Sequence, residues 1–265
     1  MQDLRLSLVQ GITRWHDPAG NRAYYGDLIA PLAGHADLVI LPETFTSGFS
    51  NDAIDRAEGM EGETVAWIRE QARKLDAAVT GSVQLRTDEG VFNRLLWATP
   101  DGDLHSYDKR HLFRYANEHK RYAAGRERLT VEWKGWRINP QVCYDLRFPV
   151  FCRNRYDVER PGQLDFDLQI FVANWPAARA HAWRTLLRAR AIENLCFVAA
   201  VNRAGTDGNK LDYSGDSAVI DFLGQPQVEL GPGEGVTTTT ISAEALAAHR
   251  ERFPAMLDAD RFELA

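Results

Sequence analysis

Three side chains that follow strand-like runs in this sequence have the right types for nucleophilic catalysis. Cys143 ends the run 136–143, and polar residues and a proline follow it at once. A cysteine attacks as its thiolate, so a reactive cysteine needs a base or a cation nearby. Glu43 follows an apolar run and is a candidate base, and Lys109 follows another run and is a candidate cation.

The elements that would position these side chains alternate along the chain, which favours α/β layers. Alternating or continuous apolar runs predict strands at 4–10, 38–41, 78–85, 92–98, 104–107, 130–133, 136–143, 168–173, 196–201, 218–222, 227–230 and 236–241. Helical periodicity and capping signals predict helices from 17 to 32 and at 64–75, 180–194 and 243–249. In the third of these helices we expect the inward-facing residues to be Trp183, Leu186, Leu187 and Ile192. No linker or repeat interrupts this order, so one domain is expected over residues 1–265.

Each candidate also has a purely structural interpretation. A free cysteine packs as a small hydrophobic residue, and we expect this role for Cys152 and Cys196. A glutamate at a strand end is usually solvated, and Lys109 lies in a charged run of the kind that usually faces solvent. Pro140 cannot donate a hydrogen bond to a neighbouring strand, so it predicts an edge or a bulge shortly before Cys143.

The motifs around these residues resemble the nitrilase, or carbon–nitrogen hydrolase, superfamily, whose signature is a Glu-Lys-Cys set in this chain order. The resemblance continues in the segments 172–176, 188–194, 201–205 and 213–217. It implies a four-layer α-β-β-α sandwich. The run from Cys143 to Pro149 and the segment around Glu118 are most similar to the omega-amidase branch, which hydrolyses the side-chain amides of small dicarboxylic acid monoamides.

The resemblance implies a role for each residue of the signature. Glu43 would take the thiol proton and later activate water, and Cys143 would form a thioester with release of ammonia. Lys109 would stabilise the oxyanion together with the backbone N–H of Tyr144, and would also favour the thiolate. Glu118 would position the lysine and the substrate. This chemistry needs no cofactor, and the histidine spacing suggests no metal site.

An omega-amidase substrate carries a carboxylate, and a buried carboxylate needs a cation. Arg147 and Arg114 are the candidate cations, because a guanidinium can bind a carboxylate through two parallel hydrogen bonds. Arg147 could instead form a structural ion pair with Asp145. The other candidate substrate-binding residues are Tyr144, Tyr115, Asn174 and Trp175. We therefore expect α-ketoglutaramate or succinamate to be preferred over an uncharged amide.

Composition limits the binding partners and the cellular compartment that we expect for this protein. The net charge of −6 provides no basic footprint for nucleic acid and no attraction to anionic membranes. No apolar stretch approaches the roughly 18 residues of a spanning helix. The three cysteines include no CxxC pair, which favours a reducing, cytoplasmic setting. We expect a homodimer that binds a small amide and neither nucleic acid nor membrane.

Two alternatives stay open. Another carbon–nitrogen hydrolase would use the same residues on a nitrile or a carbamoyl amide. A catalytically silent interaction protein could share the fold, because fold alone does not determine function. The intact set of Glu43, Lys109 and Cys143 argues against the silent protein. A structural Cys143 should react with iodoacetamide no faster than a model thiol.

Overall fold

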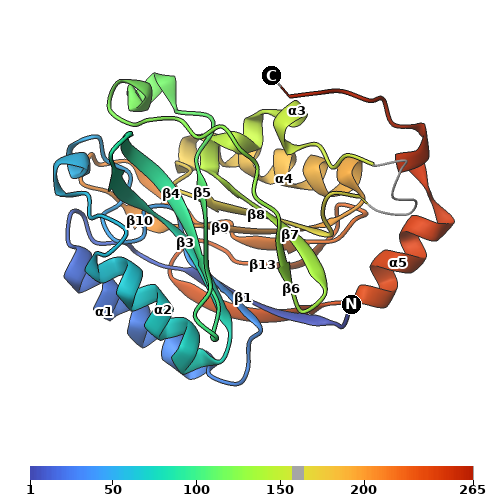
Figure 1. The fold of residues 1–265 in the computed structure, drawn as a ribbon, viewed down its shortest axis with the longest axis horizontal. Coiled ribbons are helices and arrows are strands. Elements are labelled where there is room, and N and C mark those ends of the chain that lie inside the picture. Colours follow the sequence, from blue (N-terminus) through green and yellow to red (C-terminus); the bar gives the residue numbers. More distant parts are fainter. Residues whose placement is uncertain (157–163, 265) are drawn as a thin grey trace.

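Two six-stranded sheets pack face to face in the computed structural model, which describes residues 1–156 and 164–264 (Figure 1). The first sheet has the order β14 (Gly235–Ile241), β1 (Leu4–Gln10), β2 (Leu38–Ile40), β3 (Ala78–Thr87), β4 (Gly90–Ala98) and β5 (Leu104–Asp108). The strands β1, β2 and β3 run parallel; β14 pairs antiparallel with β1, β4 with β3, and β5 with β4.

The second sheet has a parallel centre too. Its order is β13 (Pro226–Glu229), β12 (Ala218–Ile220), β9 (Phe197–Asn202), β8 (Leu168–Ala173), β7 (Trp136–Val142) and β6 (Val131–Trp133). The strands β7, β8 and β9 run parallel, with antiparallel pairs on both sides. A separate hairpin consists of β10 (Ala204–Thr206) and β11 (Asp212–Ser214). All the predicted strands are present with ends within two residues, but the short polar hairpin was not predicted.

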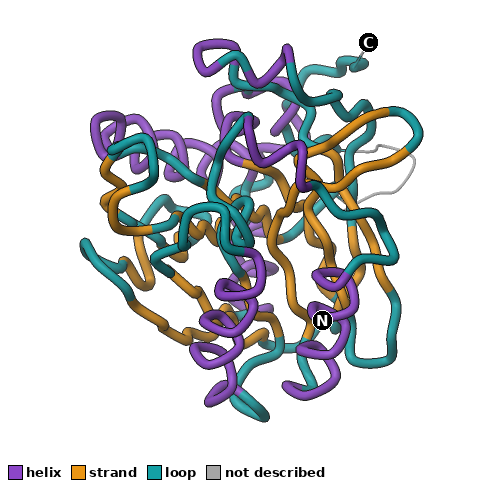
Figure 2. The backbone as a smooth tube through the Cα atoms, turned by 90° about the vertical axis from the view of Figure 1, so that its left-hand side faces the viewer, coloured by secondary structure: helices purple, strands orange, loops and turns teal. Residues whose placement is uncertain are grey.

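Helices cover the outer faces of both sheets, as the purple and orange segments of Figure 2 show. The helices α1 (Pro18–Ile29) and α2 (Glu63–Leu75) cover the first sheet, and α4 (Ala180–Asn194) covers the second. The short helix α3 (Pro149–Cys152) follows the cysteine turn, and α5 (Ala243–Arg252) packs Ala243 and Leu246 against the layer between the sheets. The predicted start of α1 is confirmed, since the Asp17 side chain accepts a hydrogen bond from Gly20 N at 2.9 Å and Pro18 is the first helical residue.

Three apolar layers hold the sandwich together. One lies between the two sheets, one between the first sheet and α1 and α2, and one between the second sheet and α4. Along β2, Leu38 and Ile40 face the other sheet while Val39 faces the helices. A strand covered on both faces needs apolar residues throughout, which explains the continuous run in the sequence. The predicted four-layer α-β-β-α sandwich is confirmed.

The predicted inward orientation is wrong for one residue of α4. Trp183 and Leu187 are buried and Leu186 is half-buried, but Ile192 is 51% exposed. The buried stripe continues from Leu187 to Ala191, one turn further on. Because each residue advances a helix by about 100°, Ile192 lies to the side of that stripe and faces outward.

Pro140 lies inside β7 without breaking its pairing. The Arg137 N–H points toward β8, where it donates to Asp167 Oδ2 at 3.1 Å. Backbone N–H groups alternate in direction along a strand, so the nitrogen of Pro140 faces the β6 side. The pairing of β6 with β7 ends at Val131 and Ile138, so β7 needs no backbone donor toward β6 at Pro140. The proline therefore marks the point where the neighbouring strand stops.

The buried stripe of α4 gives a stability prediction. Leu187→Ala should lower the free energy of unfolding by about 2–5 kcal/mol, because it leaves a cavity under the helix. Ile192→Ala, the matched change on the outer face, should cost below about 1 kcal/mol. Urea unfolding followed by circular dichroism measures both, and equal losses would contradict this packing.

Candidate active site

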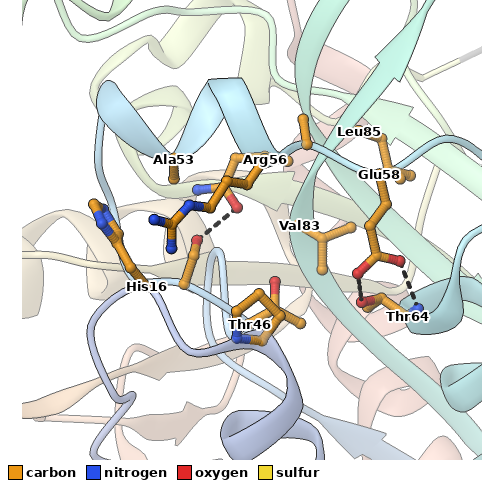
Figure 3. Close-up of a pocket in the computed structure, with 12 residues that line it drawn as sticks. His16, Thr46, Ala53, Arg56, Glu58, Thr64, Val83 and Leu85 are labelled. Carbon is orange, nitrogen blue, oxygen red and sulfur yellow. Dashed lines mark hydrogen bonds between the residues drawn. The ribbon is translucent and has the colours of Figure 1, made fainter.

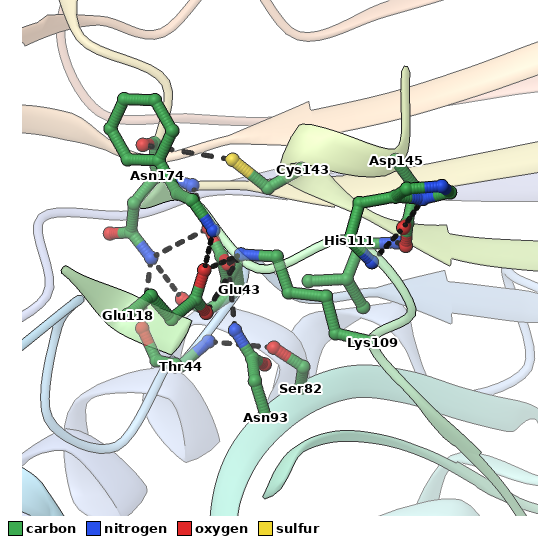
Figure 4. Close-up of polar contacts among 12 residues, drawn as sticks. Glu43, Thr44, Ser82, Asn93, Lys109, His111, Glu118, Cys143, Asp145 and Asn174 are labelled. Atoms are coloured by element: carbon green, nitrogen blue, oxygen red, sulfur yellow. Dashed lines mark hydrogen bonds and ion pairs between the residues drawn. The ribbon is translucent and has the colours of Figure 1, made fainter. Parts of the chain in front are cut away.

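Four polar or reactive side chains converge where strands of both sheets end (Figure 4). Glu43 follows β2, Lys109 follows β5, Cys143 follows β7 and Asn174 follows β8. Parallel strands that end at the same edge bring the residues after them together, and this edge is where α/β sheets gather ligands. The sandwich thus joins residues that are far apart in the sequence.

The centre of the site is a buried lysine between two carboxylates. Lys109 Nζ donates to Glu43 Oε1 at 3.0 Å and to Glu118 Oε1 and Oε2 at 3.0 and 3.1 Å. None of the three side chains is more than 1% exposed. Burial alone lowers the pKa of Lys109, but the charges of Glu118 and Glu43 outweigh it and raise that pKa well above its ordinary value. The two carboxylates therefore favour the charged form of Lys109.

Glu43 is fixed by donors from both sheets. Its Oε1 accepts from Asn93 Nδ2 at 2.8 Å, and Asn93 lies on β4 of the first sheet. Its Oε2 accepts from the backbone N–H of Asn174 at 2.7 Å, at the end of β8 in the second sheet. The Asn174 side chain also donates to the Glu43 carbonyl at 2.7 Å. These contacts orient the carboxylate toward the gap between the sheets.

Cys143 stands at a sharp turn, as predicted. Its φ angle is +47°, and the 3₁₀ turn Cys143–Arg147 follows it directly. A positive φ is unfavourable for a residue with a side chain and clusters at functional sites. Thr44, next to Glu43, also has a positive φ of 43°. The surrounding hydrogen bonds hold both strand ends in conformations that these residues rarely adopt.

The surroundings of Cys143 favour its protonated thiol. Burial raises its pKa, the negative charge of Glu43 raises it further, and Lys109 lowers it by less than these two raise it. The expectation that Lys109 favours the thiolate is confirmed in direction, since its charge lowers the pKa of the thiol, but burial and the charge of Glu43 outweigh this effect. Burial is the largest cause of the raised pKa, and the negative charge of Glu43 is the next. Slow reaction with iodoacetamide would then follow from protonation, so it does not identify a structural cysteine.

Asp145 ties the cysteine turn to the lysine segment. Its carboxylate accepts from Tyr107 Oη at 2.7 Å, His111 N at 2.9 Å and Val142 N at 3.1 Å, and His111 Nδ1 lies 2.7 Å from it. In the part of the chain that the structure describes, Asp145 forms no ion pair with Arg147. Asp145 binds the residues on either side of Lys109 instead. Sequence reasoning missed this role, because it depends on β5 and β7 ending side by side.

A cavity of about 300 Å³ opens from Cys143 and Lys109. Of the predicted substrate-binding residues, five line it: Tyr115, Tyr144, Arg147, Asn174 and Trp175. Arg114 is exposed and is not among the lining residues, so we do not propose it as a substrate ligand. Glu118 lies behind Lys109 rather than in the cavity wall. The lining residues that sequence reasoning did not select include Phe49, Phe113, Arg179, Asp207 and Tyr213.

A second cavity, drawn in Figure 3, is far smaller, at about 20 Å³. This is room for about one water molecule. In its wall Glu58 accepts hydrogen bonds from Thr64 N at 2.8 Å and Thr64 Oγ1 at 2.7 Å, so it caps the start of α2. We therefore interpret this cavity as a gap in the packing and not as a binding site. Within the described ranges, no three His, Cys, Asp or Glu side chains are grouped to hold a metal, and no helix has the length and apolarity to cross a membrane.

Comparison with known proteins identifies the family. The model of the family described as carbon–nitrogen hydrolase matches residues 5–251. The omega-amidase YafV of Yersinia enterocolitica is 48% identical over the whole of both chains. The 2-oxoglutaramate amidase of Bacillus subtilis is 34% identical over 84% of this chain and 85% of its own. The crystal structure of XC1258 from Xanthomonas campestris, a CN-hydrolase superfamily protein with an arsenic adduct in its active site, has 81% identity and a TM-score of 0.99 over both full chains.

The chain therefore belongs to the carbon–nitrogen hydrolase family. The predicted enzyme class, a thiol-dependent amide hydrolase, is confirmed at this level.

The charges around Cys143 give a prediction about its reactivity. Glu43→Gln should lower the pKa of the thiol, because it removes the negative charge that disfavours the thiolate. Alkylation by iodoacetamide at neutral pH should then become severalfold faster, even though turnover falls. Glu118→Gln is the matched control. Its effect should be smaller, since the charge of Glu118 raises the pKa of Cys143 less than the charge of Glu43 does. The pH dependence of alkylation measures this, and a slower reaction in Glu43→Gln would contradict the assignment.

Proposed function

We propose that this enzyme is an omega-amidase, which hydrolyses the side-chain amide of a small dicarboxylic acid monoamide such as α-ketoglutaramate. One observation carries the proposal: the cavity that contains the Cys143 thiol also contains the guanidinium of Arg147, which lies 4.7 Å from the centre of the Trp175 ring. A thiol and a fixed cation in one cavity suit a substrate with an amide at one end and a carboxylate at the other. The names of the two curated relatives support the same substrate class.

In the proposed first half-reaction, Glu43 takes the proton of the Cys143 thiol while sulfur attacks the amide carbon. The carbonyl oxygen becomes negative, and Lys109 Nζ and the Tyr144 N–H stabilise it. The C–N bond then breaks, and the nitrogen takes the proton from Glu43 and leaves as ammonia. The products of this half are ammonia and a Cys143 thioester.

In the second half-reaction, Glu43 takes a proton from water as the water oxygen attacks the thioester carbon. The same two donors stabilise the second oxyanion. The C–S bond breaks, the acid is released, and the sulfur recovers its proton from Glu43. Glu118 does not exchange protons in this scheme. It holds Lys109 in place and provides the negative charge that keeps the lysine paired throughout the cycle.

We also propose that the enzyme works in the cytoplasm as a single-domain homodimer. All three cysteines are free, and the mechanism requires a reduced thiol. Large apolar side chains are exposed on α4 (Ile192), in the turn between β12 and β13 (Leu223) and after α5 (Phe253). The domain count, the compartment and the dimer stay predictions.

The role of Cys143 leads to a prediction about turnover. Cys143→Ala should lower kcat by at least about 10⁴-fold, because it removes the nucleophile, and it should leave the fold intact because the residue stands at a strand end. Cys143→Ser should be nearly as inactive. Cys196→Ala is the control, since Cys196 packs in the core, and it should keep its activity. Ammonia release measures all three, and activity in Cys143→Ala would refute the mechanism.

The role of Arg147 leads to a prediction about substrate choice. The enzyme should hydrolyse α-ketoglutaramate or succinamate with a kcat/KM at least about tenfold above that for butyramide, because only the acids pair with the cation. Arg147→Met keeps an apolar side chain on Trp175 and should erase most of this preference. A panel that includes nitriles and carbamoyl compounds measures the alternatives. Equal rates on charged and neutral amides would exclude the carboxylate site.

A further inference from the structure

A second arginine, Arg179, lines the same cavity as Arg147 and Cys143. Within residues 1–156 and 164–264, neither arginine side chain forms an ion pair or a hydrogen bond to the protein. Each guanidinium contacts aromatic rings instead. An arginine stacked on a ring keeps its N–H groups free for another partner. The cavity thus contains two cations whose donors point to no protein acceptor.

Local structure fixes Arg179 in this position. It ends the 3₁₀ turn Ala177–Arg179, shortly after β8. Its carbonyl accepts from Trp175 Nε1 at 2.9 Å, and the Trp175 ring in turn lies under Arg147. The Arg179 guanidinium carbon lies 5.3 Å from the centre of the Phe113 ring and 6.0 Å from that of Tyr115. One tryptophan therefore links the two arginines, and aromatic walls hold both guanidinium groups.

The other charged groups of the cavity do not neutralise these two cations. Lys109 is paired with Glu43 and Glu118. Asp207 is directed into its own hairpin, where its carboxylate accepts from Asn209 N at 2.8 Å, Leu211 N at 3.0 Å and Tyr213 Oη at 2.9 Å. Two cations without a counter-ion in a partly enclosed site favour the binding of an anion.

We propose that Arg179 is a second anion-binding residue, which binds the far end of the substrate together with Arg147 and selects against an ammonium group there. This inference rests on the proposed function. A 2-oxo acid amide presents a carboxylate and a neutral carbonyl oxygen, and both accept hydrogen bonds from guanidinium groups. The matching 2-amino acid amide has a carboxylate and an ammonium, which would face two cations and be repelled.

The first test compares α-ketoglutaramate with glutamine in Arg179 variants. Arg179→Met should lower kcat/KM for α-ketoglutaramate about tenfold or more, chiefly through a higher KM. It should also lower the ratio of kcat/KM for α-ketoglutaramate to kcat/KM for glutamine. Arg179→Lys should keep part of the preference and provides a second variant if the methionine protein is unstable. Arg114→Met removes the same charge from a neighbouring exposed arginine outside the cavity and should change neither value. An unchanged ratio in both Arg179 variants would overturn the proposal.

The second test does not depend on turnover. Iodoacetate and iodoacetamide alkylate the same thiol but differ in charge, so the ratio of their rates at one pH reports the cations near Cys143. The rate with iodoacetate divided by the rate with iodoacetamide should fall in Arg179→Met. It should fall less in Arg179→Lys, and Arg114→Met should leave it unchanged.

The two tests separate the two proposals. If no amide is hydrolysed but the alkylation ratio depends on Arg179, the omega-amidase proposal fails and the anion site stands. If α-ketoglutaramate is hydrolysed but Arg179 affects neither the substrate ratio nor the alkylation ratio, the enzyme is an omega-amidase and Arg179 has no part in its selectivity.

Discussion

The buried amino group of Lys109 between the carboxylates of Glu43 and Glu118 is the interaction on which the rest of the site depends. All three charges are out of water, so each is tolerable only while the other two stay in place. Removing one member of such a set typically costs about 3–5 kcal/mol. This requirement fixes where β2 and β5 end, where the segment around Glu118 lies, and how the first sheet meets the second through Asn174.

The same charge balance contributes, with burial, to the raised pKa of the Cys143 thiol. A thiolate would add a third negative charge beside one lysine, in a site with little water to screen it. In the proposed mechanism the proton leaves as the attack on the substrate moves negative charge from sulfur to the carbonyl oxygen, close to Lys109. Asp145 ties the cysteine turn to the lysine segment on which this step would depend.

Much of this could be predicted from the sequence, because the signals are local. Glu43, Lys109 and Cys143 each follow a strand with its own apolar pattern, and a resemblance to one family named them together with Glu118. Asn93 and Arg179 could not be found in this way: Asn93 reaches Glu43 across 50 residues, and Arg179 faces the cavity only because of how β8 and its turn pack. The net shift in the pKa of Cys143 could not be predicted either, because it depends on burial and on all the neighbouring charges rather than on Lys109 alone.

The most direct test of the central claim is to look for the Cys143 thioester. Wild-type enzyme would be mixed with excess α-ketoglutaramate, quenched in acid within one turnover, and digested for mass spectrometry of the peptide that contains Cys143. An acyl adduct on Cys143 is expected, with one ammonia released per adduct before the acid product appears. Ammonia and acid that rise together in the first turnover, with no adduct on Cys143 at any quench time, would contradict it.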